Sequence, residues 1–153
     1  MNSLQIKAVP YQNEITAIKY IRTKVFQEEQ GVSADLEFDG LDEGSTHFVA
    51  YLDGRAVGTA RIREIDANTT KIERLAVLPA ARKQGIGKEL MASALNIIST
   101  RSKSLAVVHA QAYIANLYRQ LGFEIVGESF VEAGIPHVKM VKQLNIASGD
   151  RNS

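Results

Sequence analysis

The stretch "RLAVLPAARKQGIGKELMASAL", residues 74–95, decides the fold of this chain. It opens with an apolar run that ends at Pro79, passes through a basic turn that contains Gly85 and Gly87, and closes in a segment with apolar residues at helical spacing. This order predicts a buried strand, a turn and an amphipathic helix. The first N–H groups of such a helix lack helical partners, and glycines allow a ligand to approach them closely.

The same turn is positively charged, because it carries Arg82, Lys83 and Lys88. Since a helix N-terminus also attracts anions, the sequence predicts a phosphate-binding turn; the alternative is a solvated helix start without a ligand. Two known phosphate motifs do not fit. A P-loop would need glycine in place of Arg82 and a hydroxyl residue in place of Glu89. A Rossmann fingerprint would need a third glycine in place of Leu90.

Composition limits the kinds of partner. A formal net charge of +1 over 153 residues gives no overall attraction to nucleic acid or to an anionic membrane. The chain has no cysteine, which excludes disulfides, thiolate zinc sites and cysteine nucleophiles, and with only three scattered histidines we expect no metal site. There is no signal-peptide pattern and no apolar run of membrane-spanning length. We therefore expect a soluble, cytoplasmic protein.

The remaining pattern predicts one α/β domain over residues 1–144, followed by a flexible tail, 145–153. Helices are expected from Asn13 toward Gly31, from 85 to 99 and from 112 to 121, the last ended by Gly122. Strands are expected at 4–9, in a hairpin around Asp53-Gly54, and at 70–78, 104–110, 123–130 and 135–143. The acidic segment 33–45 is predicted to be a loop.

Two segments carry a family resemblance. Arg82-Lys83-Gln84-Gly85-Ile86-Gly87 behind "LAVLP" resembles the acetyl-CoA motif of the GNAT superfamily of N-acetyltransferases. "AQAYIANLYRQLGFEIVG", residues 110–127, resembles a later motif of the superfamily, which it matches at Leu117, Tyr118, Gly122 and Phe123. It departs from that motif at Gln111, usually asparagine, and at Ile114, usually alanine. "RTKVFQEEQ", "THFVAYLDGRAVGTARIR" and "GIPHVKM" look like a small bacterial-type subgroup of unassigned substrate, so the resemblance covers residues 5–143.

The resemblance implies a single-domain GNAT fold: a central mixed, mostly antiparallel sheet, splayed between the fourth and fifth main strands and flanked by helices. It also implies acetyl-CoA as co-substrate, with its pantetheine arm on the strand at 71–78 and its pyrophosphate on the turn. The cofactor-binding residues expected on this basis are Leu75, Ala76, Val77, Arg82, Lys83, Gln84, Gly85, Ile86, Gly87, Lys88 and Gln111.

The implied reaction passes acetyl directly to a primary amine of a small molecule or peptide in a ternary complex, which agrees with the absence of a cysteine nucleophile. Tyr118 occupies the position that the family uses to protonate the departing thiolate; the alternative is a core tyrosine packed below Phe123. Glu73 is the candidate base, because it shares strand parity with Leu75 and Val77. Alternatively, its carboxylate pairs with Arg61 or Arg63.

His109 is a candidate proton relay or a hydrogen-bonded strand-end residue, His137 could border the acceptor pocket, and His47 is expected to be structural. The acidic segment does not match a calcium loop, because Thr46 takes the place of the closing glutamate. It is either an acceptor lid or a solvated loop. The alternative functions are a catalytically silent CoA-binding sensor and, less well supported by the charge, an RNA or protein scaffold. A homodimer is left open.

Overall fold

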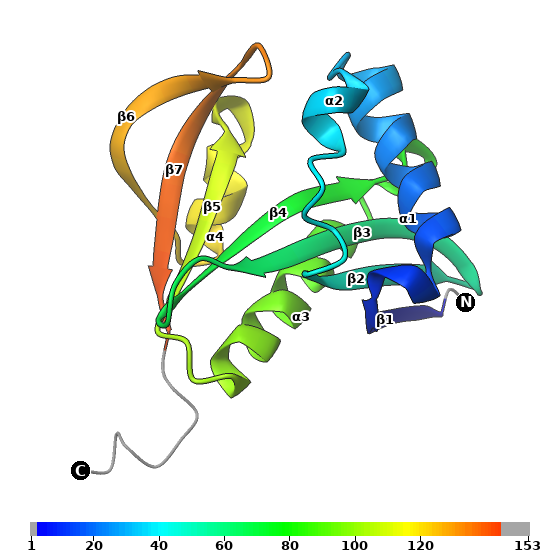
Figure 1. The fold of residues 1–153 in the computed structure, drawn as a ribbon, viewed down its shortest axis with the longest axis horizontal. Coiled ribbons are helices and arrows are strands. Elements are labelled where there is room, and N and C mark those ends of the chain that lie inside the picture. Colours follow the sequence, from blue (N-terminus) through cyan, green and yellow to red (C-terminus); the bar gives the residue numbers. More distant parts are fainter. Residues whose placement is uncertain (1–2, 145–153) are drawn as a thin grey trace. The chain divides into compact units, whose positions relative to one another are not determined.

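The computed structural model describes residues 3–144, so the predicted tail lies outside the described residues. The strands are β1 (Leu4–Pro10), β2 (Thr46–Leu52), β3 (Arg55–Glu64), β4 (Thr69–Val77), β5 (Leu105–Gln111), β6 (Glu124–Glu132) and β7 (Ile135–Gln143). The α-helices are α1 (Ile15–Arg22), α2 (Ala34–Glu37), α3 (Ile86–Thr100) and α4 (Ala115–Gln120), as Figure 1 shows. This order of strands and longer helices confirms the predicted α/β pattern, including the hairpin turn at Asp53-Gly54.

The strands form one mixed sheet in the order β1-β2-β3-β4-β5-β7-β6. The pairs β1–β2, β2–β3, β5–β7 and β6–β7 are antiparallel, whereas β4 and β5 are parallel. The register of the parallel pair runs from Thr69 opposite Leu105 to Ile72 opposite Val108. As the resemblance implies, β4 and β5 therefore pair over only part of their lengths.

The chain folds as two compact units, with β4 and α3 each divided between them. The first unit contains residues up to Arg63 and Glu73–Ala94. One face of its strands is covered by α1, where Ile18 packs against Val49. The first turns of α3 pack against the other face. Cδ1 of Leu90 lies there, only 3.1 Å from the position that a Cβ on Gly58 would occupy, so glycine makes room for the helix. Figure 1 shows α1 and α3 on these two faces.

The first helix differs from the prediction at both ends. Asn13 belongs to a short 3-10 turn, Tyr11–Asn13, and Glu14 occupies the N-cap position that was predicted for Asn13. After Arg22 the helix continues as a π-helix, η2 (Thr23–Glu29), which keeps Val25 buried. π-Helical segments are rare and often occur at functional sites. The acidic segment, predicted to be a loop, contains the short helix α2.

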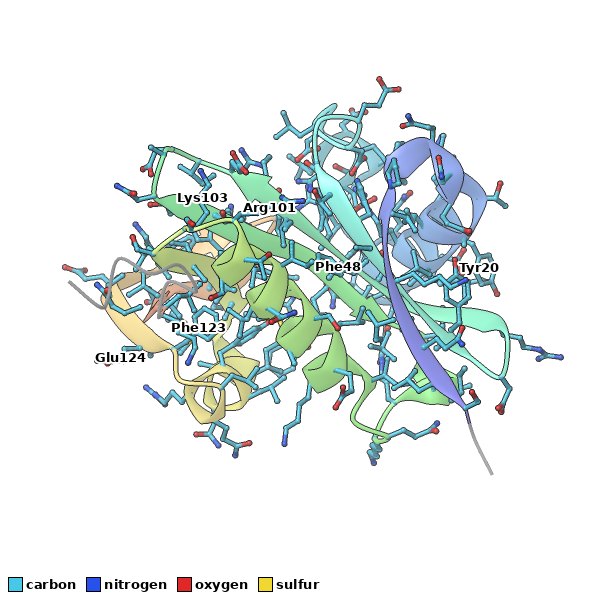
Figure 2. The ribbon with its side chains drawn as sticks, turned by 90° about the horizontal axis from the view of Figure 1, so that it is seen from below. Tyr20, Phe48, Arg101, Lys103, Phe123 and Glu124 are labelled. Atoms are coloured by element: carbon cyan, nitrogen blue, oxygen red, sulfur yellow. The ribbon has the colours of Figure 1, made fainter. Side chains whose placement is uncertain are left out.

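The second unit contains residues 64–72 and the described chain from Leu95 onward. Its helix α4 ends at Gly122, as predicted, with a left-handed φ of +95°. The N–H of Phe123 donates to the carbonyl of Tyr118 at 3.0 Å, which turns the chain directly into β6. Figure 2 labels the buried Phe123 beside Glu124, at the start of β6.

Replacing Gly122 by alanine should lower the free energy of unfolding by about 1–2 kcal/mol, because an L-residue is strained at this φ. Lys142 also lies where the new Cβ would stand, although its flexible end can move. Gly44→Ala is the control, since Gly44 has open space around it and no left-handed φ. Equal effects of the two substitutions in urea unfolding would contradict this account of the α4 terminus.

Candidate active site

The predicted phosphate-binding turn follows β4 through a short 3-10 turn, η3 (Pro79–Ala81), and leads into α3. Lys83 and Gly85 both have left-handed backbones, with φ of +66° and +79°. The N–H of Glu89 donates to the carbonyl of Gly85 at 3.0 Å, which closes the first turn of the helix. The helix supplies no acceptor for the N–H groups of Ile86, Gly87 and Lys88, which precede this bond.

The space beside the two glycines of this turn is open. A Cβ at Gly87 would meet no protein atom within 4 Å, and its φ lies outside the left-handed range, so neither packing nor backbone geometry requires glycine there. At Gly85 the space is equally open, but the left-handed φ favours glycine. The side chain of Ile86 is buried in the core, so only its backbone can contact a ligand. The turn therefore combines N–H groups that lack helical acceptors, open space at Gly85 and Gly87, and the positive charges of Lys83 and Lys88.

The guanidinium of Arg82, predicted to bind phosphate, is engaged by the protein itself. Its Nε donates to the carbonyl of Val77 at 2.9 Å, and Nη1 and Nη2 donate to the two carboxylate oxygens of Glu29 at 2.6 and 2.5 Å. The hydrogen bond from Arg82 holds the pKa of Glu29 below its usual value. Glu29, at the end of η2, was missed in the sequence because it lies 53 positions from Arg82 and no local pattern joins them.

Strand β4, predicted to bind the pantetheine arm, is irregular at Arg74, which has a left-handed φ of +56°. The guanidinium of Arg74 donates to the carbonyls of Leu36 and Glu37 at 3.1–3.2 Å, and so anchors this strained residue to α2. A left-handed residue interrupts the two-residue alternation of a strand. Strand parity therefore does not place Glu73 on the face of Leu75 and Val77, which was the reason for choosing Glu73 as the base.

The carboxylate of Glu73 lies in an ion-pair cluster. It accepts hydrogen bonds from Nε of Arg61 at 2.9 Å and from Nε of Arg63 at 2.9 Å, and a further short one from Nη2 of Arg61. The side chain of Arg61 is fully buried and that of Glu73 is only 7% exposed. The structural alternative stated for Glu73, pairing with Arg61 or Arg63, is thus found with both arginines.

The cluster extends into the acidic segment. Arg61 also binds Asp39 and Asp42, and Arg22 binds Glu37 and Asp42 at 2.7 and 2.6 Å. The network joins four arginines to four carboxylates: Arg22, Arg61, Arg63 and Arg74 with Glu37, Asp39, Asp42 and Glu73. Three carboxylates of the acidic segment, Glu37, Asp39 and Asp42, are therefore paired with arginines and are not simply solvated.

The pKa values of two carboxyl groups of this network, Asp39 and Asp42, lie below their usual values. Burial alone would raise the pKa of Asp42, but the hydrogen bonds and charges of Arg22 and Arg61 outweigh it and hold the pKa below its usual value. The same balance, set mainly by Arg61, strongly lowers the pKa of Asp39. Since the folded-state pKa values are depressed, the stabilisation is present above about pH 4 and is lost as pH falls through the folded values.

His47 is structural, as expected. Burial lowers its pKa and so favours the neutral ring, and its Nε2 donates to the carbonyl of Asp42 at 2.9 Å, which joins β2 to the acidic segment. In the second unit, Tyr118 is also buried, which raises its pKa to about 12 and keeps its hydroxyl protonated at neutral pH. Its ring packs edge-on against Phe123, with centroids 5.9 Å apart, which is the contact that the packing alternative requires.

The other predicted residues of the second unit lie on β5 and β7. Nδ1 of His109 lies 3.1 Å from Oε1 of Glu132, and its ring meets Phe130 edge-on at 5.1 Å between centroids. Phe130 stacks at 5.9 Å on His137, whose Nδ1 donates to the carbonyl of Ile135 at 2.7 Å. Gln111 ends β5 opposite His137. Glu132 and Phe130 were not predicted, because they lie on a later strand with no motif of their own.

Within residues 3–144, no helix combines the length and apolar character needed to cross a membrane. The same range contains no group of three histidine, aspartate or glutamate side chains placed to hold a metal ion.

The sheet is mixed, with β4 and β5 parallel, and a glycine turn leads from β4 into the N-terminus of α3. This fold is shared with solved structures of N-acyltransferases. The chain belongs to the GNAT acetyltransferase family, since the acetyltransferase (GNAT) domain matches residues 9–144. It is 37% identical to the Bacillus subtilis protein YyaT over 145 residues, covering 93% of this chain and 97% of that one. The crystal structure of an acyl-CoA N-acyltransferase from Pseudomonas aeruginosa superposes with a TM-score of 0.81 at 30% identity, covering 92% and 99% of the two chains. The protein is an N-acetyltransferase-type acyltransferase.

Replacing Glu73 by glutamine should lower the free energy of unfolding by about 3 kcal/mol, because it leaves the buried Arg61 short of a negative partner. Glu64→Gln is the matched control: it removes the same charge from an exposed carboxylate near Arg101 and Lys103. Urea unfolding of the two variants compares the effects. A loss from Glu73→Gln no larger than that of the control would show that the cluster does not depend on this carboxylate.

Proposed function

We propose that the protein transfers acetyl from acetyl-CoA directly to a primary amine of a small molecule or peptide. Family membership supports acetyl transfer. A GNAT acetyltransferase of Elizabethkingia anophelis, which shares the fold at a TM-score of 0.74 and 18% identity, has acetyl-CoA bound in its crystal structure. The observation that carries the proposal here is the open space at Gly87, beside N–H groups that the helix leaves without acceptors.

The proposed cofactor contacts follow from this turn. The N–H groups of Ile86, Gly87 and Lys88 hold the pyrophosphate, and Lys83 and Lys88 supply the positive charge. Backbone groups of β4 from Leu75 to Val77 pair with the pantetheine arm, with Gln111 as a further polar contact. Acetyl-CoA supplies an activated acyl group in its thioester, so the protein needs no nucleophile of its own.

Tyr118 is the proposed acid. The departing thiolate of CoA needs a proton or a strong hydrogen bond, and a hydroxyl that stays protonated at neutral pH can supply it. The burial that raises its pKa also keeps water away from the ring. Packing against Phe123 fixes the ring orientation, so the contact seen in the structure serves either role.

Of the candidate bases, His109 is favoured over Glu73. Two guanidinium groups already donate to the carboxylate of Glu73, which leaves it little capacity to accept a proton. Nδ1 of His109 lies 3.1 Å from Oε1 of Glu132, and a ring that donates from Nδ1 to this carboxylate has its lone pair on Nε2, at the opposite side of the ring. Glu73 is then a positioning residue that fixes Arg61 and Arg63 beside β4.

A thiol-release assay over a panel of amines tests the proposal. The panel contains polyamines, aminoglycosides, amino acids and peptides with a free amine, each with acetyl-CoA and a reagent for the released thiol. Amine-dependent release of CoA is expected for at least one class, with the acetylated product identified by mass spectrometry. Tight binding of acetyl-CoA with no release for any amine would instead favour the CoA-binding sensor.

Replacing Gly87 by leucine should separate folding from cofactor binding. Leucine is a better residue inside a helix than glycine by roughly 0.5–1 kcal/mol, and a Cβ at this position meets open space, so the free energy of unfolding should stay the same or rise. The bulky side chain should obstruct the pyrophosphate, so the Kd for acetyl-CoA should rise about tenfold or more in calorimetric titration. An unchanged Kd would place the pyrophosphate elsewhere.

Replacing Tyr118 by phenylalanine should lower kcat roughly a hundredfold, because it removes the hydroxyl and keeps the buried ring. The Kd for acetyl-CoA and the unfolding transition should stay close to those of the parent. Tyr113→Phe, at an exposed tyrosine five positions earlier, is the matched control. If both variants turn over at the parental rate, Tyr118 has only a packing role.

A further inference from the structure

We infer that Glu29 is a positioning residue for cofactor binding: paired with Arg82, it holds the phosphate-binding turn in its left-handed shape. The inference rests on the proposed function, since it assigns the residue that prepares the turn for the pyrophosphate of acetyl-CoA. All the groups involved belong to the first unit.

The geometry is a clamp across three segments. The guanidinium of Arg82 folds back on its own chain, where Nε binds the carbonyl of Val77 at the end of β4. Its two terminal nitrogens meet both carboxylate oxygens of Glu29 at 2.5–2.6 Å, in the fork geometry that suits arginine and carboxylate. Arg82 thus fastens the start of the turn to β4 on one side and to the end of η2 on the other.

The clamp lies next to strained backbone. Lys83, the residue after Arg82, has a φ of +66°, which an L-residue adopts only at a cost in free energy. Such a residue persists where its surroundings fix it, and strained residues of this kind gather at ligand sites. The fixed Arg82 on one side and α3 on the other hold Lys83 and Gly85 in the left-handed path that leads into the N–H groups of Ile86, Gly87 and Lys88.

The clamp also gives the basic residues of the turn different roles. Because Arg82 already binds Val77 and Glu29, its part is to shape the turn, and Lys83 and Lys88 carry the charge that attracts phosphate. The Arg82–Glu29 pair is more than one-third exposed, so it contributes little to overall stability. Its loss should therefore appear in cofactor affinity and leave the unfolding transition nearly unchanged.

Glu29→Gln tests the inference, with Glu28→Gln as the matched control. Glu28 precedes Glu29 on the same helix and pairs with Lys24, so its substitution makes the same charge change without touching Arg82. Calorimetric titration should show the Kd for CoA rising about tenfold in Glu29→Gln and staying within twofold of the parent in Glu28→Gln. The KM for acetyl-CoA should rise in parallel, with kcat and the KM for the amine unchanged.

A double-mutant cycle adds a second readout. Arg82→Lys keeps the charge but cannot reach Val77 and both oxygens of Glu29 together, so it should lose a similar amount of affinity. The double variant should lose no more than either single variant, because both remove one clamp.

Two results would overturn the inference. A Kd in Glu29→Gln equal to that of Glu28→Gln would show that the clamp does not shape the turn. A tighter Kd would show that Glu29 competes with phosphate for Arg82. Either result would leave the proposed function standing, whereas a parent protein that fails to bind CoA would reject the function and the inference together.

Discussion

The buried guanidinium of Arg61 is the constraint on which the first unit depends. A charge without solvent must be paired, and Arg61 is paired with carboxylates from three places in the chain: Asp39, Asp42 and Glu73. The acidic segment therefore has to fold back on β3 and β4. Arg22 completes the arrangement from α1, through Glu37 and Asp42. A segment with the composition of a solvated loop is in this way fixed against the strand that the family uses for its cofactor.

Arginines from the same unit hold the irregular backbone of β4 and of the glycine turn that follows it. Arg74 is left-handed within β4, and its side chain is anchored on carbonyls of α2. Lys83 is left-handed in the turn, beside Arg82 and its bonds to Val77 and Glu29. Strain of this kind lasts only where the surroundings oppose relaxation. The ion pairs that fix the acidic segment and η2 therefore also fix the backbone of β4 and the turn, where we propose that the pantetheine and the pyrophosphate bind.

The parts of the fold that depend on local patterns could be predicted from the sequence. The strand, glycine turn and helix of residues 74–95, the hairpin at Asp53-Gly54 and the helix end at Gly122 all follow from residues close together in the chain. The Arg82–Glu29 clamp and the Arg22–Asp42 pair could not be predicted, because they join residues far apart without a shared motif. The face of Glu73 was inferred from the regular alternation of side chains along a strand. Because Arg74 is not a glycine, the sequence gave no sign that its backbone would be left-handed and would break this alternation.

Backbone amide spectra recorded during a titration with CoA test the central claim most directly, that a preformed row of N–H groups at the start of α3 receives the pyrophosphate. The account predicts large shift changes and slower hydrogen exchange for the amides of Lys83 to Lys88, with the same residues responding to inorganic pyrophosphate at higher concentration. Saturable CoA binding that leaves these amides unchanged, with the responses confined to other segments, would contradict it.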